Sequence, residues 1–179
     1  GGNIIGNSAT ENGVGGGGVY VGGGTFTMEG DASITGNTAE YGGGVYNSGT
    51  FKMSEAASIK GNSASAYGGG VYVCDGGKFE MSGDSITGNS AFEGGGVYVT
   101  GTTSMFTMSG GTIGGTGDEG NEAKNGGGVF VYGYGGVRTF TMMGGNITGN
   151  SAGEFGGGVC VGGCTFEMSG GSITGNSAK

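Results

Sequence analysis

A repeat of about 26 residues runs through the whole chain and is represented by the stretch GGGVYVCDGGKFEMSGDSITGNSA, from Gly68 to Ala91. Three segments of this stretch, GGGVYV, KFEMSG and DSITGNSA, alternate apolar residues with polar or small ones and are bounded by Gly, Asn, Asp and Ser. Such alternation is typical of strands with one buried face. Three short strands per repeat predict one coil of a parallel β-helix. We therefore predict an all-β parallel solenoid of about six coils, forming a single domain over residues 1–179.

Equivalent positions recur in a fixed order. The first valine of the first segment recurs at Val19, Val45, Val71, Val97, Val129 and Val159, with spacings of 26, 26, 26, 32 and 30 residues. The second segment carries Phe-x-Met, at Phe26/Met28, Phe51/Met53, Phe79/Met81, Phe106/Met108, Phe140/Met142 and Phe166/Met168. The third segment centres on Ile34, Ile59, Ile86, Ile113, Ile147 and Ile173. Stacking of coils would turn each position into a column, and these apolar columns are predicted to fill the core.

Two insertions explain the long spacings. One lies near residues 114–120 and the other near residues 132–138. Insertions at corners leave the stacked strands in register and are expected to project outward. A specific function would be expected in these two loops first.

The glycine content has a structural explanation. The chain contains 53 Gly and no Pro, and its period is far longer than the three residues of collagen. Ordered recurrence of Val, Phe, Met and Ile also argues against disorder. So many glycines are expected to serve tight corners and close stacking.

One column consists of asparagine. A stacked Asn at a corner can hydrogen-bond to the same residue one coil away and satisfy buried backbone groups. We assign a structural ladder to Asn7, Asn37, Asn62, Asn89, Asn121, Asn150 and Asn176.

Aromatic residues form a second column, between two valine positions of the first segment. If the valines point inward, an exposed aromatic ladder results, comprising Tyr20, Tyr46, Tyr72, Tyr98 and Phe130, with Cys160 completing the row. Such rings bind sugar faces, pack against a neighbouring helix, or simply stack across strands, and simple stacking is favoured. The opposite orientation, with the tyrosines inside, stays open at this point.

Hydroxyl residues flank the isoleucine of the third segment. The pairs are Ser33/Thr35, Ser58/Lys60, Ser85/Thr87, Thr112/Gly114, Asn146/Thr148 and Ser172/Thr174. A flat hydroxyl array is what an ice-binding solenoid presents, but Lys60 and Gly114 interrupt it. Ser-x-Thr is also common on the solvent face of a strand.

Charge and composition exclude several classes of function. The net charge is −8, and the six basic residues are scattered, which disfavours nucleic acid as a partner. No apolar run is long enough to cross a bilayer, so no membrane insertion is expected. Without histidine, zinc sites of the usual kind and Ser-His-Asp catalysis are excluded, and the dispersed acids suggest no glycosidase pair. We predict a non-enzymatic chain with no catalytic residues, no metal site and no cofactor.

Cysteine spacing restricts disulfide formation. Cys74 lies about three coils from the other two cysteines, too far for a bridge at about 4.8 Å per coil. Cys160 and Cys164 flank a Gly-Gly corner, where a bridge is conceivable, although free thiols are favoured.

The repeats GGGVYV, GGTFTMSGG and SITGNSA resemble those of surface proteins described as adhesin-like or polymorphic outer-membrane-protein-like. The likeness covers essentially all 179 residues. It implies a right-handed parallel β-helix, export to the extracellular space or cell surface, and roles in adhesion or surface architecture.

Two kinds of function are expected from these features. The first is a non-enzymatic extracellular structural protein, either an adhesin-like stalk or a subunit of a filament formed by end-to-end stacking of β-helices. Self-association, head-to-tail or lateral, is expected. The alternative is a flat-face module that binds ice or a surface polysaccharide.

Overall fold

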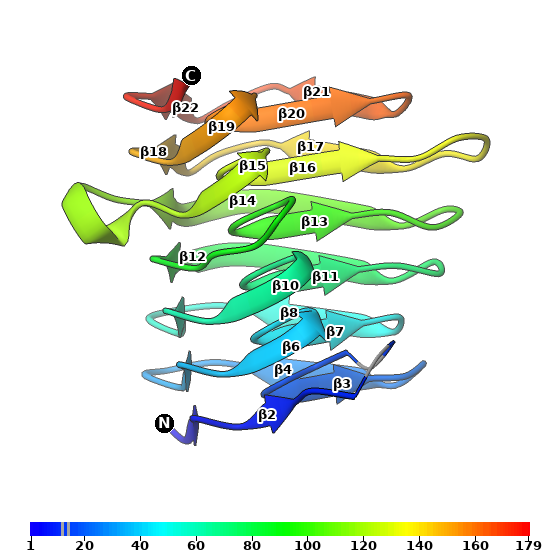
Figure 1. Ribbon diagram of the computed structural model, residues 1–179, viewed down its shortest axis with the longest axis vertical. Helices are drawn as coiled ribbons and strands as arrows, with labels where there is room; N and C mark the ends of the chain where they lie inside the picture. Colours follow the sequence, from blue (N-terminus) through cyan, green and yellow to red (C-terminus); the bar gives the residue numbers. More distant parts are fainter. Residues whose placement is uncertain (12, 14) are drawn as a thin grey trace.

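The computed structural model describes residues 1–11, 13 and 15–179. The chain forms a β-solenoid of about six turns whose equivalent residues lie about 27 residues apart (Figure 1). Every strand pair among the described residues is parallel, which confirms the predicted fold class.

The strands fall into four rows that run along the solenoid. The first row contains β3 (Val19–Val21), β7 (Val45–Asn47), β11 (Val71–Val73), β13 (Val97–Val99), β16 (Val129–Tyr132) and β20 (Val159–Gly162). The second row contains β4 (Thr25–Met28), β8 (Thr50–Met53), β12 (Lys78–Thr87), β14 (Met105–Gly114), β17 (Thr139–Met142) and β21 (Thr165–Met168). The third row contains β1 (Asn3–Ile5), β5 (Ser33–Thr35), β9 (Ser58–Lys60), the ends of β12 and β14, β18 (Asn146–Thr148) and β22 (Ser172–Thr174). The fourth row contains β2 (Ser8–Ala9), β6 (Thr38–Tyr41), β10 (Ser63–Tyr67), β15 (Glu122–Asn125), β19 (Ser151–Phe155) and β23 (Ser177–Ala178).

The third sequence segment contributes to two rows, because it bends at a glycine. Gly36, between β5 and β6, has φ 65°, and Gly61 and Gly149 have φ 63° and 66° at the same point of their coils. Glycine adopts this left-handed conformation without steric cost. The expected third strand is therefore two shorter strands in most coils, with the ladder Asn directly after the bend.

In the strand register, each core residue pairs with the same residue type in the neighbouring coils. Phe79 of β12 pairs with Phe51 of β8 and Phe106 of β14. Ile86 likewise pairs with Ile59 and Ile113. Since a slip of one residue would turn every core side chain outward, the alternation in each strand specifies this register.

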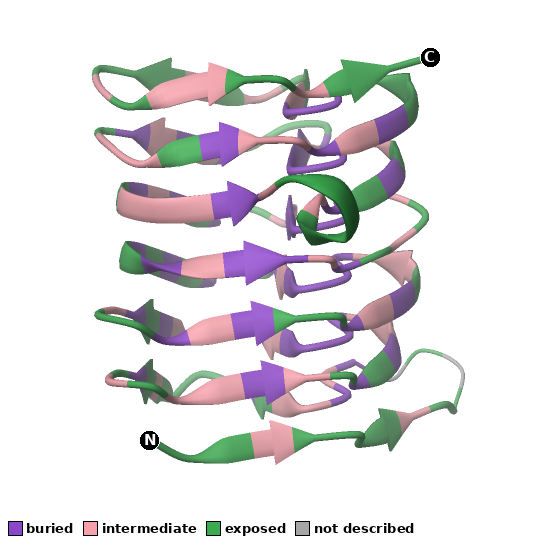
Figure 2. Cartoon of the chain, turned by 90° about the vertical axis from the view of Figure 1, so that its left-hand side faces the viewer, coloured by how far each residue is buried: buried purple, intermediate pink, exposed green. Residues whose placement is uncertain are grey.

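The core is a stack of large apolar side chains inside the coils, where buried residues line the inner surface (Figure 2). Phe79 and Phe106 are fully buried, with ring centroids 4.7 Å apart and an interplanar angle of 8°. Each such side chain contributes about 1.5–3 kcal/mol when buried. The Val, Phe, Met and Ile columns therefore form the core, as the sequence predicts.

The two insertions differ in structure. The first contains the short 3-10 helix η1 (Gly117–Glu119), which projects from the stack (Figure 1). The last residue of η1, Glu119, contacts the preceding coil, because the Gly88 N–H donates to its carbonyl oxygen at 2.9 Å. The second follows β16 and exposes Tyr134 and Val137.

Candidate functional site

The asparagine column is a continuous hydrogen-bonded ladder. The backbone N–H and Nδ2 of Asn62 donate to Asn89 Oδ1 at 2.9 and 3.0 Å. Asn62 Nδ2 also donates to the Ile34 carbonyl oxygen at 3.0 Å. The same contacts repeat from Asn37 to Asn150, and Asn7 and Asn176 continue the ladder at its two ends. From Asn37 to Asn150 these side chains satisfy one another inside the stack, whereas Asn7 at the N-terminal end is exposed.

The aromatic residues of the first row face away from the core, because Val71 and Val73 on either side of Tyr72 are fully buried. The orientation with tyrosines inside is thereby excluded. The expectation of an exposed ladder is nevertheless wrong for part of the row. Tyr20 is 62% exposed, whereas Tyr98 is only 3% exposed and Phe130 is also buried.

A second aromatic pair, Tyr41 and Tyr67, lies over part of this row, and Tyr67 covers Tyr98. Tyr67 stacks on Tyr98 with ring centroids 4.7 Å apart and an interplanar angle of 20°. Tyr41 contacts Tyr72 at 5.5 Å. Both residues stand directly before a Gly-Gly-Gly corner, which was the sequence signal that pattern reasoning missed.

Stacking also occupies the ring faces within the row. The Tyr20 and Tyr46 rings are 4.8 Å apart at 15°. Sugars bind aromatic side chains through an open ring face, and the rings from Tyr46 to Tyr98 contact neighbouring rings on both sides. Tyr20, at the end of the row, has one ring neighbour. The aromatic rings of the first row therefore stack across strands, which is the interpretation that the sequence favours.

The phenols and the buried thiol of this region are held in their neutral forms. Burial, and then a hydrogen bond with Cys74, raise the pKa of Tyr46. Burial likewise raises the pKa of Tyr98. Burial raises the pKa of Cys74 to about 12. Because the thiolate is the reactive form of cysteine, Cys74 is an inert part of the structure.

The hydroxyl column beside the third-row isoleucines is not a continuous flat array. Thr87 is buried next to the first insertion, and Gly114 is also buried. Lys60 is exposed and its Nζ lies 3.9 Å from Glu119 Oε1 of the insertion. Ice binding on a flat hydroxyl face is therefore not favoured by this geometry.

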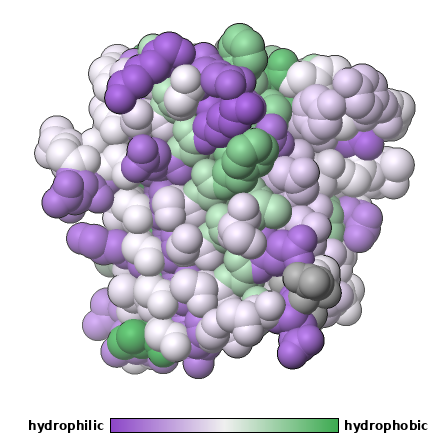
Figure 3. All heavy atoms as spheres, viewed as in Figure 1, coloured by the Kyte–Doolittle hydropathy of each residue, from purple (hydrophilic) through white to green (hydrophobic). Residues whose placement is uncertain are grey.

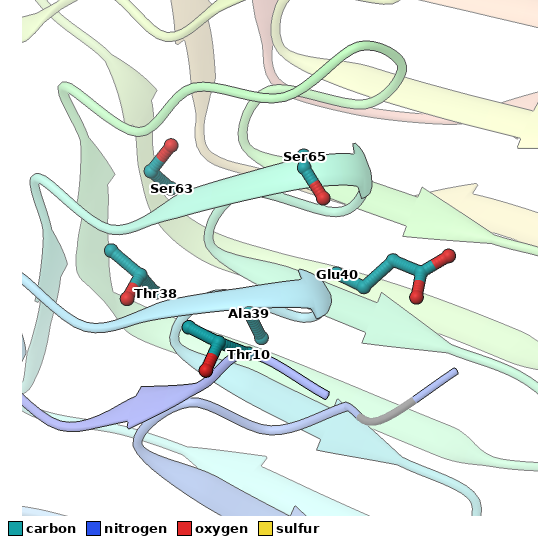
Figure 4. A pocket seen from close by; sticks show the side chains of 6 residues that line it. All are labelled: Thr10, Thr38, Ala39, Glu40, Ser63 and Ser65. Carbon is teal, nitrogen blue, oxygen red and sulfur yellow. The ribbon is translucent and has the colours of Figure 1, made fainter. Parts of the chain in front are cut away.

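A different surface, over the fourth row, is hollowed. Near one end, a hollow of about 420 Å³ is lined by Thr10, Thr38, Ala39, Glu40, Ser63 and Ser65 (Figure 4). Thr38 Oγ1 donates to Ser8 Oγ at 3.0 Å. A hydrogen bond from the Gly13 N–H lowers the pKa of Glu40, the one carboxylate that lines the hollow. This arrangement brings together no pair of acids for general acid–base chemistry within the lining residues.

Asn47 and Arg138 are among the buried polar residues that the sequence analysis did not anticipate. Asn47 replaces a valine in the first row, and its Nδ2 donates to the Lys78 carbonyl oxygen at 2.9 Å. Arg138 is buried in the second insertion, where its Nη1 donates to the Gly135 carbonyl oxygen at 2.5 Å. In the sequence, Asn47 is marked only by a break in the valine column, and Arg138 only by its place in an irregular corner.

The cysteines are free thiols in this structure. Cys160 lies in the outward aromatic row, paired with Phe130, whereas Cys164 packs against the core. The two side chains therefore lie on opposite sides of the chain, which answers the question left open by their spacing. Burial raises the pKa of the Cys164 thiol, although the Arg138 guanidinium opposes this shift.

Residues 1–11, 13 and 15–179 contain no cluster of three or more His, Cys, Asp or Glu side chains suited to a metal ion. Over the same residues, no helix has the length and hydrophobicity required to cross a membrane.

The two ends of the stack carry exposed apolar surface. At the N-terminal end, a hollow of about 250 Å³ lies beneath β4 and is lined by residues that include Ile4, Phe26 and Met28. At the C-terminal end, Phe166 is half-buried and Met168 is 47% exposed. Along the side, Figure 3 shows hydrophobic surface in a broken band down the middle of the face seen in Figure 1. Of the residues that line the N-terminal hollow, Ile4 and Phe26 are half-buried, whereas Met28 is buried.

Comparisons with protein-family models, with curated proteins and with solved structures give no match. The structure supports the solenoid part of the likeness to surface repeat proteins, and the comparisons support none of it.

Proposed function

We propose that this chain is a non-enzymatic structural protein of the cell surface or extracellular space, in which the stacked coils form a stiff rod. The rod is either part of an adhesin-like stalk or the subunit of a filament formed by end-to-end stacking. The observation that carries this proposal is the uniform stack of coils, in which the same core residues pair from one coil to the next.

Three continuous ladders support a stiff rod. Parallel backbone pairing links each coil to the next, the Phe rings stack from Phe26 to Phe166, and the Asn side chains form a hydrogen-bonded column. In a solenoid each coil contacts only its neighbours, so length can be added without redesigning the core. A protein of this kind spans distance rather than enclosing a substrate.

The end faces support continuation of the stack. Open strand edges and apolar cross-sections favour further pairing. In a stalk, further coils of a longer chain would cover the end faces, whereas in a filament another copy would cover them. Location outside the cell rests on the resemblance of the repeats GGGVYV and SITGNSA to those of surface proteins.

Electron microscopy of native material, beside the chain Gly1–Lys179 expressed alone, tests the proposal. Uniform fibres with an axial repeat near about 30 Å, the height of six coils at about 4.8 Å each, would establish the filament form. Short rods from the isolated chain, with immunogold label on surface projections of the source cells, would establish the stalk form. Label confined to the cell interior would contradict both.

A further inference from the structure

Two adjoining hollows lie over the fourth row, beside the first insertion. Their volumes are about 320 Å³ and about 340 Å³. Ser90, Glu122 and Ser151, which pair with one another from coil to coil, line both hollows, so the two form one trough. The pairing continues to Ser63 on one side and to Ser177 on the other, so the trough lies within the stack. Each volume is at the low end of the range for ligand sites, about 300–1,000 Å³.

The first insertion forms one wall of this trough. Asp118 of η1 lines the hollow of about 320 Å³, and η1 projects beside the start of β15 (Figure 1). Two contacts hold this wall on the preceding coils. The Gly88 N–H donates to the Glu119 carbonyl oxygen at 2.9 Å, and Lys60 Nζ lies 3.9 Å from Glu119 Oε1. A wall that is fixed before binding loses little conformational freedom when a ligand binds.

An exposed aromatic ring stands in the other hollow. Phe92 lines the hollow of about 340 Å³ and is 51% exposed, at a position held by Ser65 in the preceding coil. Lys124 Nζ lies 5.4 Å from the centroid of this ring and 3.1 Å from Glu154 Oε1. Because an ammonium group has three donors, this ion pair leaves others for a ligand. The hollow therefore presents an apolar ring with a hydrogen-bond donor beside it.

Two carboxylates of the trough are open to solvent. Asp118 and Glu122 are exposed, and none of the ion pairs among the described residues includes either of them. An ionised carboxylate accepts hydrogen bonds through both oxygens and donates none, whereas the hydroxyls of Ser90 and Ser151 can do both. The trough thus offers mainly acceptors on one side and a ring with a donor on the other.

These groups match a neutral sugar polymer better than a charged ligand. Sugar hydroxyls donate charge-assisted hydrogen bonds to carboxylates, and the apolar face of a sugar ring can pack on an aromatic side chain. An anionic polymer would be repelled by Asp118 and Glu122 and by the net charge of −8. A metal ion is not favoured, because the described residues form no cluster of three or more metal-ligating side chains.

We propose that this trough binds a segment of a neutral polysaccharide. Asp118 and Glu122 accept hydrogen bonds from sugar hydroxyls. Phe92 packs against the apolar face of one sugar ring, and Lys124 donates to a sugar oxygen. This surface is separate from the first-row aromatic rings and from the hydroxyl column of the third row. The inference goes beyond the proposed function, because it places a ligand on the side of the rod in either of its forms.

Affinity electrophoresis of the full chain tests for binding. The probes are native gels that contain a mannan, a β-glucan or a galactan, and a gel with alginate is the anionic control. We expect at least one neutral polysaccharide to retard the chain relative to a reference protein in the same gel, and alginate to have no effect. Absence of retardation by all three neutral probes, or equal retardation by alginate, overturns the proposal.

Two substitutions test whether the trough is the site, and each introduces a residue that the repeat already uses at that position. Phe92→Ser copies Ser65, and Glu122→Ser copies Ser90. Each is expected to raise the dissociation constant for the retarding polysaccharide by at least about tenfold, because it removes the ring or one of the carboxylates.

Matched controls carry the same kinds of side chain on other faces. Tyr134→Ser removes an 86% exposed ring from the second insertion, and Glu167→Thr removes an exposed carboxylate from the second row. Both controls should bind like the parent. If Phe92→Ser and Glu122→Ser also bind like the parent, or if all four variants weaken binding equally, the trough is not the site.

Removal of residues 115–119 tests the wall. The deletion joins Gly114 to Gly120 and restores the spacing of three residues that separates Ile86 from Asn89 in the preceding coil. The shortened chain should keep a β-sheet circular dichroism spectrum and bind at least about tenfold more weakly. A folded shortened chain that binds like the parent contradicts the proposed trough. Failure of these binding tests would leave the rod of the proposed function intact, because microscopy tests the rod separately.

Discussion

At the scale of single residues, the carboxyl group of Asp84 is buried with incomplete hydrogen bonding. It occupies a column held by Ala32 and Ala57 in earlier coils and by Gly111 and Gly145 in later ones. It is 6% exposed, its Oδ1 accepts one hydrogen bond from the Gly83 N–H at 3.2 Å, and its Oδ2 has no partner. Burial raises the pKa of this carboxyl from 3.8 to about 6.

Asp84→Ala is expected to stabilise the protein, and more so at neutral than at acid pH. Between pH values of about 4 and 6 the folded state keeps a proton that the unfolded chain loses, so the parent's free energy of unfolding falls as pH rises and then levels off. Allowing for partial hydration of the charged carboxylate, the variant should gain about 1–2 kcal/mol over this interval. Urea denaturation from pH 4 to 8 measures it, with Asp118→Ala, at an exposed carboxylate, as the control. If the gain in the free energy of unfolding does not change with pH, burial does not raise the pKa of Asp84 and the prediction is wrong.

At the scale of elements, the Gly-Gly-Gly corner before each first-row strand is a close contact between the backbones of neighbouring coils. A Cβ on Gly70 would lie 2.6 Å from the Gly96 carbonyl oxygen of the next coil. The φ of Gly70 lies outside the left-handed region, so close approach of backbones, and not backbone conformation, requires glycine there.

Gly70→Ala should therefore lower the free energy of unfolding by about 1–3 kcal/mol, as an overpacked position does. Gly24→Ala provides a matched control, because a Cβ there meets nothing within 4 Å. The control should show no loss of stability in thermal or urea denaturation. If both variants lose the same free energy of unfolding, the cost of replacing glycine comes from chain entropy and not from steric contact between coils.

At the scale of the whole molecule, stability should vary along the stack. Coils in the middle contact two neighbours, whereas the end coils of the chain Gly1–Lys179 contact one, and solenoids behave as chains of such neighbour interactions. Ile86 and Ile113 are fully buried, but Ile4 and Ile173 near the two ends are only half-buried.

Hydrogen exchange read by mass spectrometry should show this gradient. Amides from residues 71–142 are expected to exchange at least about tenfold more slowly than those of residues 1–41 and 159–179, because end coils open without disturbing the middle. Assembly into filaments should remove the gradient by covering both ends. Uniform exchange across the isolated chain would instead indicate that it opens as one cooperative unit.

Much of this architecture follows from the sequence by itself. Alternation with period two and a repeat near 26 residues bring like residues into columns, and a column of Phe79 with its equivalents, or Asn89 with its equivalents, has one low-energy arrangement in a parallel stack. The local pattern therefore determined the solenoid, its core and its hydrogen-bonded ladder.

Only the tertiary structure decided which outward positions are covered. Tyr98 is buried because Tyr67, from another row and coil, stacks on it. Cys160 lies in the outward row and Cys164 packs against the core, although a single corner joins them. Oδ2 of the buried Asp84 has no hydrogen-bond partner. These features depend on contacts between positions that the repeat does not relate, so no periodicity in the sequence can reveal them.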